Sequence, residues 1–182
     1  MCILSIDIGV HNLGYAVYDV ENNILNFDVY DIDKHKNRNE NTVIGRVKAV
    51  SAFLDNLFMK YTFTKVIIER QVSNNICAME MMYLLAGIIN EYGAEIVIFD
   101  PKCKFTALSI PYDTRNKAHK KLSVMIAENY ITKYYNVQLK NFQAFKKKDD
   151  IADAVFMLFV ELFKGDAEKL NEIRQCSFPH QE

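Results

Sequence analysis

The 182-residue chain lacks the features that mark secreted, membrane-bound or zinc-binding proteins. Its four cysteines are scattered, with no Cys-x-x-Cys pair and no histidines at zinc-ligand spacing, so they indicate reduced thiols. The longest nearly apolar run, 76–89, is interrupted by Glu80 and is too short to span a bilayer. The N-terminus carries no basic leader. These absences argue against secretion and membrane insertion, and we expect a cytosol-like compartment.

Glycine and proline are also scarce, at six and three residues, whereas 50% of the residues are hydrophobic. A chain of this length and composition can bury a full core in one domain. We expect that domain to span residues 1–164. Residues 165–182 carry few core positions, so we expect them to form a loosely held C-terminal tail.

Short runs rich in β-branched residues predict five strands, at 2–8, 13–19, 24–30, 65–70 and 94–99. The second and third runs are separated only by Glu21, Asn22 and Asn23, which predicts a hairpin and an antiparallel arrangement of the first three strands. Helical patterns follow at 42–57, 75–92 and 116–134, and a last helix begins near Asp150. The fold class is therefore α/β, with a five-stranded mixed sheet and helices on both faces.

The net charge of −1 conceals a strongly basic segment. Residues 102–148 contain eleven Lys and Arg against two Asp and Glu, a net +9, so the rest of the chain sums to −10. Such a segment is typical of proteins that bind a polyanion, although a solvated lysine surface is the simpler alternative. Here the basic run leads directly into an acidic cluster, which favours phosphates as the partner.

Three lysines, 146–148, precede three closely spaced aspartates at the start of an apolar helix. Asp150 and Asp153, or Asp149 and Asp153, would share a helix face and present two carboxylates side by side. The plainer interpretation is a helix start, with Asp149 or Asp150 as the N-cap. Asp153 favours a site, because residues 154–160 are apolar on almost every side and a charge there needs partners or a cation.

Two more acids, Asp7 and Glu69, close the first and fourth predicted strands. Either one alone fits a simpler role, as a turn residue or a solvated strand end. The predicted topology, however, brings both toward Asp150 and Asp153, and four carboxylates cannot crowd together without cations. Carboxylate ligands suit Mg²⁺ or Mn²⁺, so the residues predict a two-metal site for phosphodiester hydrolysis.

Segment 7–16, with its Asp-x-Gly-x-x-x-x-Gly-aromatic pattern, resembles the first strand of the RuvC-type resolvases in the ribonuclease H-like superfamily. Residues 67–69 are similar to that family's second acidic strand, and 150–154 resemble its final Asp-x-x-Asp-Ala helix. The chain as a whole looks most like the poxvirus Holliday junction resolvases. Asp149 leaves the helix assignment uncertain by one residue, and the family spacing favours Asp150.

The resemblance implies a ribonuclease H-like fold and a homodimeric endonuclease that makes paired nicks in four-way and other branched DNA. It implies two Mg²⁺ ions per site, with Mn²⁺ as a substitute and no organic cofactor. It also implies action on concatemers of a viral genome in the host cytoplasm. The implied catalytic and metal-binding residues are Asp7, Glu69, Asp150 and Asp153.

Bacterial relatives place lysines after the fifth strand and at the start of the next helix. Several lysines compete for these roles here, and we favour Lys104 and Lys121. The candidate DNA-binding residues are Lys102, Lys104, Lys117, Lys120 and Lys121. Two alternatives of the same fold stay open: a nuclease that acts on RNA–DNA hybrids, and a non-catalytic module that binds nucleic acid.

The helix predicted at 75–92 is hydrophobic nearly all round, whereas a helix lying on a sheet needs only one apolar stripe. We therefore expect one of its faces to form the isologous contact of a dimer. The alternative is that the last helix or the tail covers this face within one chain. The candidate contact residues are Met79, Met82, Tyr83 and Ile89.

Overall fold

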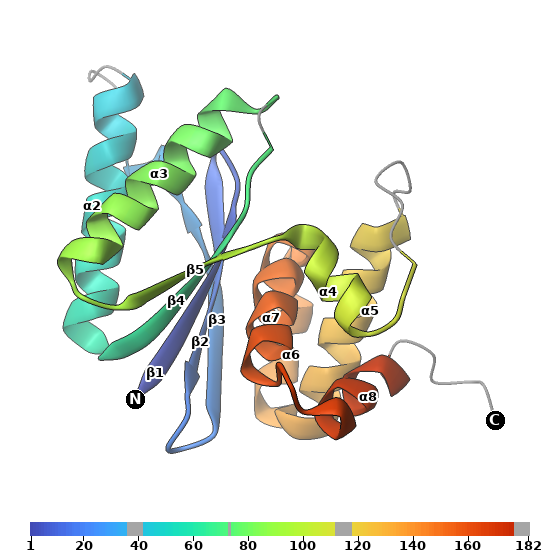
Figure 1. Cartoon of the computed structure of the whole chain (residues 1–182). Coiled ribbons are helices and arrows are strands. Elements are labelled where there is room, and N and C mark those ends of the chain that lie inside the picture. Colours follow the sequence, from blue (N-terminus) through green and yellow to red (C-terminus); the bar gives the residue numbers. More distant parts are fainter. Residues whose placement is uncertain (36–41, 73, 112–117, 177–182) are drawn as a thin grey trace.

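The computed structural model describes residues 1–35, 42–72, 74–111 and 118–176. Its central feature is a twisted five-stranded sheet in the order β3-β2-β1-β4-β5 (Figure 1). The strands are β1 (Cys2–Ile8), β2 (Asn12–Asp19), β3 (Ile24–Asp31), β4 (Phe63–Glu69) and β5 (Glu95–Phe99). The first three are antiparallel, and β4 and β5 run parallel to β1. The predicted mixed sheet is confirmed.

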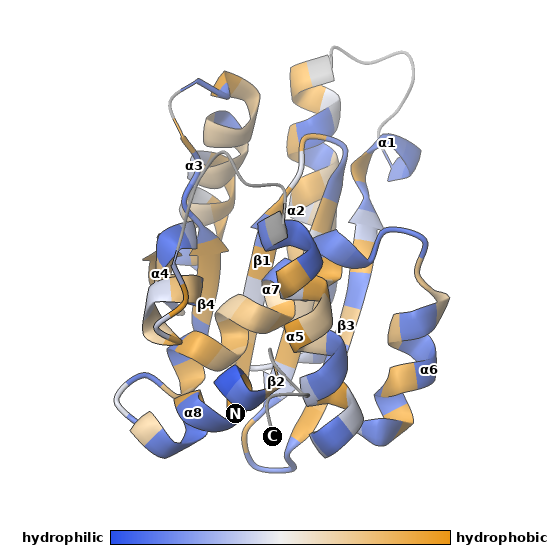
Figure 2. Ribbon diagram, turned by 90° about the vertical axis from the view of Figure 1, so that its right-hand side faces the viewer, coloured by the Kyte–Doolittle hydropathy of each residue, from blue (hydrophilic) through white to orange (hydrophobic). Residues whose placement is uncertain are grey.

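Helices cover both faces of the sheet, as predicted (Figure 1). One face packs against α2 (Thr42–Lys60) and α3 (Ile76–Glu91), and the other against α7 (Lys148–Leu162), with α5 (Ala118–Tyr134) outside it. Two apolar cores result, one on each side. Hydrophobic colours dominate the centre of the sheet, whereas the outlying helices α6 (Asn136–Ala144) and α8 (Ala167–Gln175) are largely hydrophilic (Figure 2).

Helix α7 is buried around most of its circumference. Ile151, Ala152 and every residue of 154–160 are buried, because the helix lies between β1 and β2 on one side and α5 on the other. This burial on nearly all sides explains why residues 154–160 are apolar without forming a single stripe. The position also brings the acidic N-terminal turn of α7 onto the sheet.

Besides α8, three short helices were not predicted: α1 (Ile32–His35), α4 (Pro101–Ala107) and α6. Helix α4 begins in the connection after β5, where the Asp100 side chain accepts a hydrogen bond from the Lys102 amide and Pro101 takes the first turn. Both are typical helix-start residues. The segment that we interpreted only as a basic connection is therefore partly ordered as a helix.

The prediction of a loosely held tail is wrong for residues 167–176. Helix α8 begins at the Asp166 cap and packs against α5, with Ile173 and Cys176 buried in the core. The Asn129 side chain also donates a hydrogen bond to the carbonyl of Cys176. A few apolar residues on one face suffice to dock a short helix, and the low overall hydropathy of the segment concealed them.

The predicted dimer contact on α3 needs correction too. Met82 and Ile89 are 7% and 0% exposed and belong to the core beneath α3, so they cannot contact a second subunit. Tyr83 is 64% exposed and stays available for a contact with a second subunit.

No helix in the described ranges is long and apolar enough to cross a membrane.

Candidate active site

Two acidic residues stand side by side where β1 and β4 end. The parallel register pairs Ile6 with Ile68, so Asp7 and Glu69 follow as neighbours on adjacent strands. Side chains alternate along a strand, and Ile67 belongs to the core beneath α7. Asp7 and Glu69 therefore lie on the α7 side of the sheet.

Gly14 allows α7 to approach the sheet at this point. It is paired with Asp7 across β1 and β2, and a Cβ atom at Gly14 would lie 2.2 Å from the carbonyl oxygen of Asp150. That separation is far below a van der Waals contact, so only glycine permits it. Gly9 makes the tight turn between the strands, and its amide donates to the Asn12 carbonyl at 2.9 Å. The glycines of the first motif thus bring the α7 aspartates to Asp7.

Asp150 and Asp153 complete the group on the first turns of α7. Together with Asp7 and Glu69 they line one cleft of about 430 Å³. Asp149 does not line it, because its Oδ2 accepts a hydrogen bond from the Lys120 Nζ at 3.0 Å. The structure therefore brings together all four predicted carboxylates and separates them from the adjacent aspartate.

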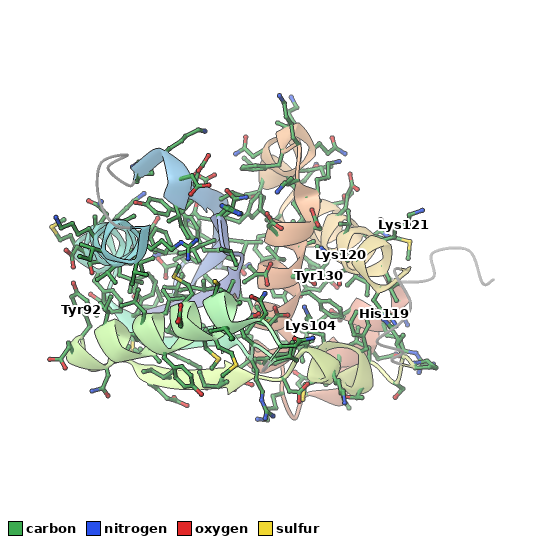
Figure 3. The ribbon with its side chains drawn as sticks, turned by 90° about the horizontal axis from the view of Figure 1, so that it is seen from above. Tyr92, Lys104, His119, Lys120, Lys121 and Tyr130 are labelled. Atoms are coloured by element: carbon green, nitrogen blue, oxygen red, sulfur yellow. The ribbon has the colours of Figure 1, made fainter. Side chains whose placement is uncertain are left out.

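Lys104, on α4, reaches into this group. Its Nζ lies 2.7 Å from Asp153 Oδ1 and 3.1 Å from Glu69 Oε1, and only 3% of the side chain is exposed. Figure 3 shows Lys104 between the sheet and α7. We favoured Lys104 as one of the two lysines implied by the resemblance and as a DNA contact, but we did not predict its pairing with two of the carboxylates. The helix-start signal at Asp100 and Pro101 could have indicated it, because a helix there places Phe105 and Lys104 together on the inner side.

The four carboxylates do not share the same electrostatic environment. Burial, and then the charges of Glu69 and Asp153, raise the pKa of Asp7 well above its ordinary value. Burial acts in the same direction on Glu69, but Lys104 and a hydrogen bond from Asp7 hold the pKa of Glu69 below its ordinary value. Burial and the nearby Asp149 raise the pKa of Asp150.

Lys104 itself is held in the charged form. Burial alone would lower its pKa, but the negative charges of Asp153, Glu69 and Asp7 together raise the pKa of Lys104 above its ordinary value. Among the described residues, the Lys104 ammonium is the only positive charge in direct contact with Glu69 and Asp153. The Gln71 amide adds a hydrogen bond to Glu69 Oε2 at 3.4 Å.

An all-carboxylate donor set suits hard divalent cations such as Mg²⁺ and argues against zinc. Within the described ranges, however, no three acidic, histidine or cysteine side chains are already gathered around one point to hold a metal ion. The donors present thus fit a divalent cation in kind, but Lys104 lies between two of them.

The predicted lysines differ in their relation to the cleft. Lys120 lines it, whereas Lys121 points outward from α5 (Figure 3) and Lys102 is exposed on α4. Lys117 lies outside the described residues. Among the lining residues that sequence reasoning missed are the buried Ser123, and His119, whose ring packs on Phe105 at 4.7 Å between centroids. Neither has a motif that would have distinguished it.

A family model described as the poxvirus A22 protein matches residues 1–163. The chain belongs to this family. This match confirms the resemblance that was inferred from the acidic motifs. All four acids lie within the matched range. A search of curated proteins by sequence gives no match.

Solved structures share the fold. The fowlpox virus Holliday junction resolvase is 22% identical with a TM-score of 0.60, over 91% of this chain and 99% of the resolvase. The same resolvase with its substrate Holliday junction DNA is 19% identical with a TM-score of 0.61, over 90% and 99%. Thermus thermophilus RuvC is 17% identical with a TM-score of 0.63, over 91% and 95%. The predicted ribonuclease H-like architecture of the RuvC type is confirmed.

Proposed function

We propose that this member of the poxvirus A22 protein family is a Mg²⁺-dependent endonuclease that resolves four-way DNA junctions by paired, symmetric nicks. The observation that carries the proposal is the convergence of four carboxylates from β1, β4 and α7 on one cleft. Its fold is that of the fowlpox virus resolvase, which has been solved with Holliday junction DNA. The acids are Asp7, Glu69, Asp150 and Asp153.

These four residues would hold two Mg²⁺ ions, with Mn²⁺ as a substitute. Such ions, when bound, supply the charge that activates water and stabilises the leaving oxygen of the phosphodiester. The chain contributes position: Asp7 and Glu69 stand on paired central strands, and Asp150 and Asp153 on a helix buried around most of its circumference. Side chains on rigid elements keep the spacing that catalysis needs.

The basic segment would hold the DNA. Residues 102–148 carry the net charge of +9, and three of the candidate lysines, Lys102, Lys120 and Lys121, are exposed. Lys120 lines the cleft itself, so it would meet a phosphate close to the carboxylates. Lysines at these positions would offset the repulsion between the acidic cleft and the DNA backbone.

We also propose a homodimer, because a four-way junction has two equivalent strands to cut. The apolar surface that supports it lies on α2 and α3, where several large hydrophobic side chains are exposed. They are Val43 (57%), Ile44 (53%), Val47 (38%), Ile76 (68%) and Tyr83 (64%). An isologous contact would pair this surface with its own copy. The four free cysteines fit the reducing host cytoplasm, which we propose as the compartment.

A cleavage assay with Mg²⁺ on a four-way junction, a linear duplex and an RNA–DNA hybrid of matched sequence tests the proposal. We expect paired nicks near the branch point of the junction and little cutting of the other two substrates. Preferential cutting of the hybrid would replace junction resolution by a ribonuclease activity. Junction binding without cleavage in either Mg²⁺ or Mn²⁺ would indicate a non-catalytic module.

A further inference from the structure

Lys104 occupies the place in the cleft where positive charge is most needed. Its ammonium lies 2.7 Å from Asp153 Oδ1 and 3.1 Å from Glu69 Oε1, so it connects α4 to both α7 and β4. The side chain is 3% exposed, which leaves little water to screen these contacts. Without the lysine, two partly buried carboxylates would face each other and Asp7 with no cation between them.

The same oxygens are those that a divalent cation would need. Four carboxylates line the cleft, yet in the described part of the chain no three of them are gathered around one point as a metal site. A cation cannot bind Glu69 and Asp153 while the ammonium lies between them, because two positive charges at such distances repel strongly. Binding therefore requires the lysine to move.

We propose that Lys104 is a built-in substitute for the metal, which holds the carboxylates together in the metal-free protein and leaves Glu69 and Asp153 when a divalent cation binds. The inference rests on the metal-dependent function proposed above. The flexible four-carbon stem of lysine allows the ammonium to swing within the cleft that it lines.

The displaced ammonium needs a new partner, and a DNA phosphate entering the cleft provides one. Metal binding is therefore weak in the free protein and stronger when DNA is present. Because such coupling is reciprocal, the metal also strengthens DNA binding in the same proportion. This keeps the free protein from assembling a competent site without its substrate.

The test measures binding of Mn²⁺ alone, without DNA, by titration calorimetry on the full chain. We expect Lys104→Met to bind Mn²⁺ roughly tenfold more tightly than the wild type, which corresponds to about 1.4 kcal/mol. Lys104→Arg keeps the charge and should show no gain. Lys60→Met is the control, because Lys60 is an exposed lysine at the end of α2 that does not line the cleft, and the Mn²⁺ affinity of this variant should stay within about twofold of the wild type.

Thermal unfolding supplies a second readout. The metal-free Lys104→Met variant should unfold at a lower temperature than the wild type, and Mn²⁺ should raise its midpoint by more than it raises that of the wild type. A purely structural ion pair would lower the midpoint without increasing the affinity for Mn²⁺. Equal or weaker Mn²⁺ binding by Lys104→Met therefore overturns the proposal.

A crystal structure of the wild type with Mn²⁺ decides the matter even if Lys104→Met does not fold. The Lys104 Nζ is expected beyond about 4 Å from both Glu69 and Asp153, and an ammonium that still bridges them beside a bound ion contradicts the proposal. A wild type that binds Mn²⁺ but cuts no junction overturns the nuclease activity alone. If neither protein binds Mn²⁺ in the absence of DNA, the proposal for Lys104 fails, whereas the nuclease activity is judged separately by the cleavage assay.

Discussion

Gly14→Ala is the substitution that tests most directly how the cleft is assembled. The Cβ of alanine would lie 2.2 Å from the Asp150 carbonyl oxygen and 2.5 Å from its carbonyl carbon, and both are backbone atoms that no rotamer change can move. Either α7 or β2 must therefore shift. Asp150 and Asp153 stand on that part of α7, and Asp7 is the β1 partner of Gly14.

The size of the shift follows from the contact. An ordinary contact of 3.4 Å requires the two groups to separate by about 1 Å. A displacement of that size in a catalytic group lowers rates by about 100-fold. Forcing a methyl group into a packed interface costs a further 1 to 3 kcal/mol of folding stability, roughly. We expect a folded protein whose junction cleavage is about 100-fold slower.

Single-turnover cleavage of a four-way junction in Mg²⁺ measures the rate, and circular dichroism with thermal unfolding shows that the variant is folded. Gly87→Ala is the control, because a Cβ there meets nothing within 4 Å and the residue is exposed on α3. It should cleave normally and gain up to about 1 kcal/mol. Wild-type cleavage by Gly14→Ala would refute the idea that this close approach sets the spacing of the carboxylates.

Three further predictions concern the chemistry, the DNA and the assembly. Replacing each cleft acid singly by its amide should lower the cleavage rate at least about 100-fold, with junction binding retained. Asp149→Asn is the control and should cleave within about twofold of the wild type. Gel assays of junction binding and of junction cleavage measure the two effects. The four variants are Asp7→Asn, Glu69→Gln, Asp150→Asn and Asp153→Asn. Junction affinity should fall steeply as the salt concentration rises. Alanines at 117, 120 and 121 together should flatten the slope of log K against log salt by about 0.9 for each phosphate that is no longer neutralised. An unchanged slope would mean that these lysines are merely solvated. Tyr83→Lys should convert a dimer to monomers in equilibrium sedimentation and abolish paired nicking, and a wild type that is monomeric with and without junction DNA would contradict the dimer.

Local patterns sufficed for the sheet. Five short runs of β-branched residues predicted the five strands, because each is bounded by turn residues and is short enough to exclude a helix. The short helices α1, α4 and α6 escaped prediction, because four, seven and nine residues show too few turns for a helical period to be visible. Helix α8 escaped for a related reason, since few of its residues are apolar.

The acidic group was predictable because its members stand at strand ends and a helix start, positions that motif spacing alone defines. The resemblance favoured Lys104 and Lys121 among the lysines of the basic segment, but nothing in the spacing predicted that Lys104 pairs with the acids. Its selection depends on α4, whose start at Asp100 turns this side chain inward to Glu69 and Asp153 and leaves Lys102 outside. The preference for Lys121 has no support in the cleft, where Lys120 is the lysine of α5 that lines it.

By itself, the sequence determined the five strands, the long helices and the acids that stand at their ends, since these follow from the order of residues along the chain. The tertiary structure alone decided which lysine side chain contacts those acids, namely Lys104, and which apolar residues of α3 remain exposed. A helix that is hydrophobic all round has no periodic signal to separate the buried Met82 from the exposed Tyr83. Only the packing of α3 against the sheet and α2 makes that distinction.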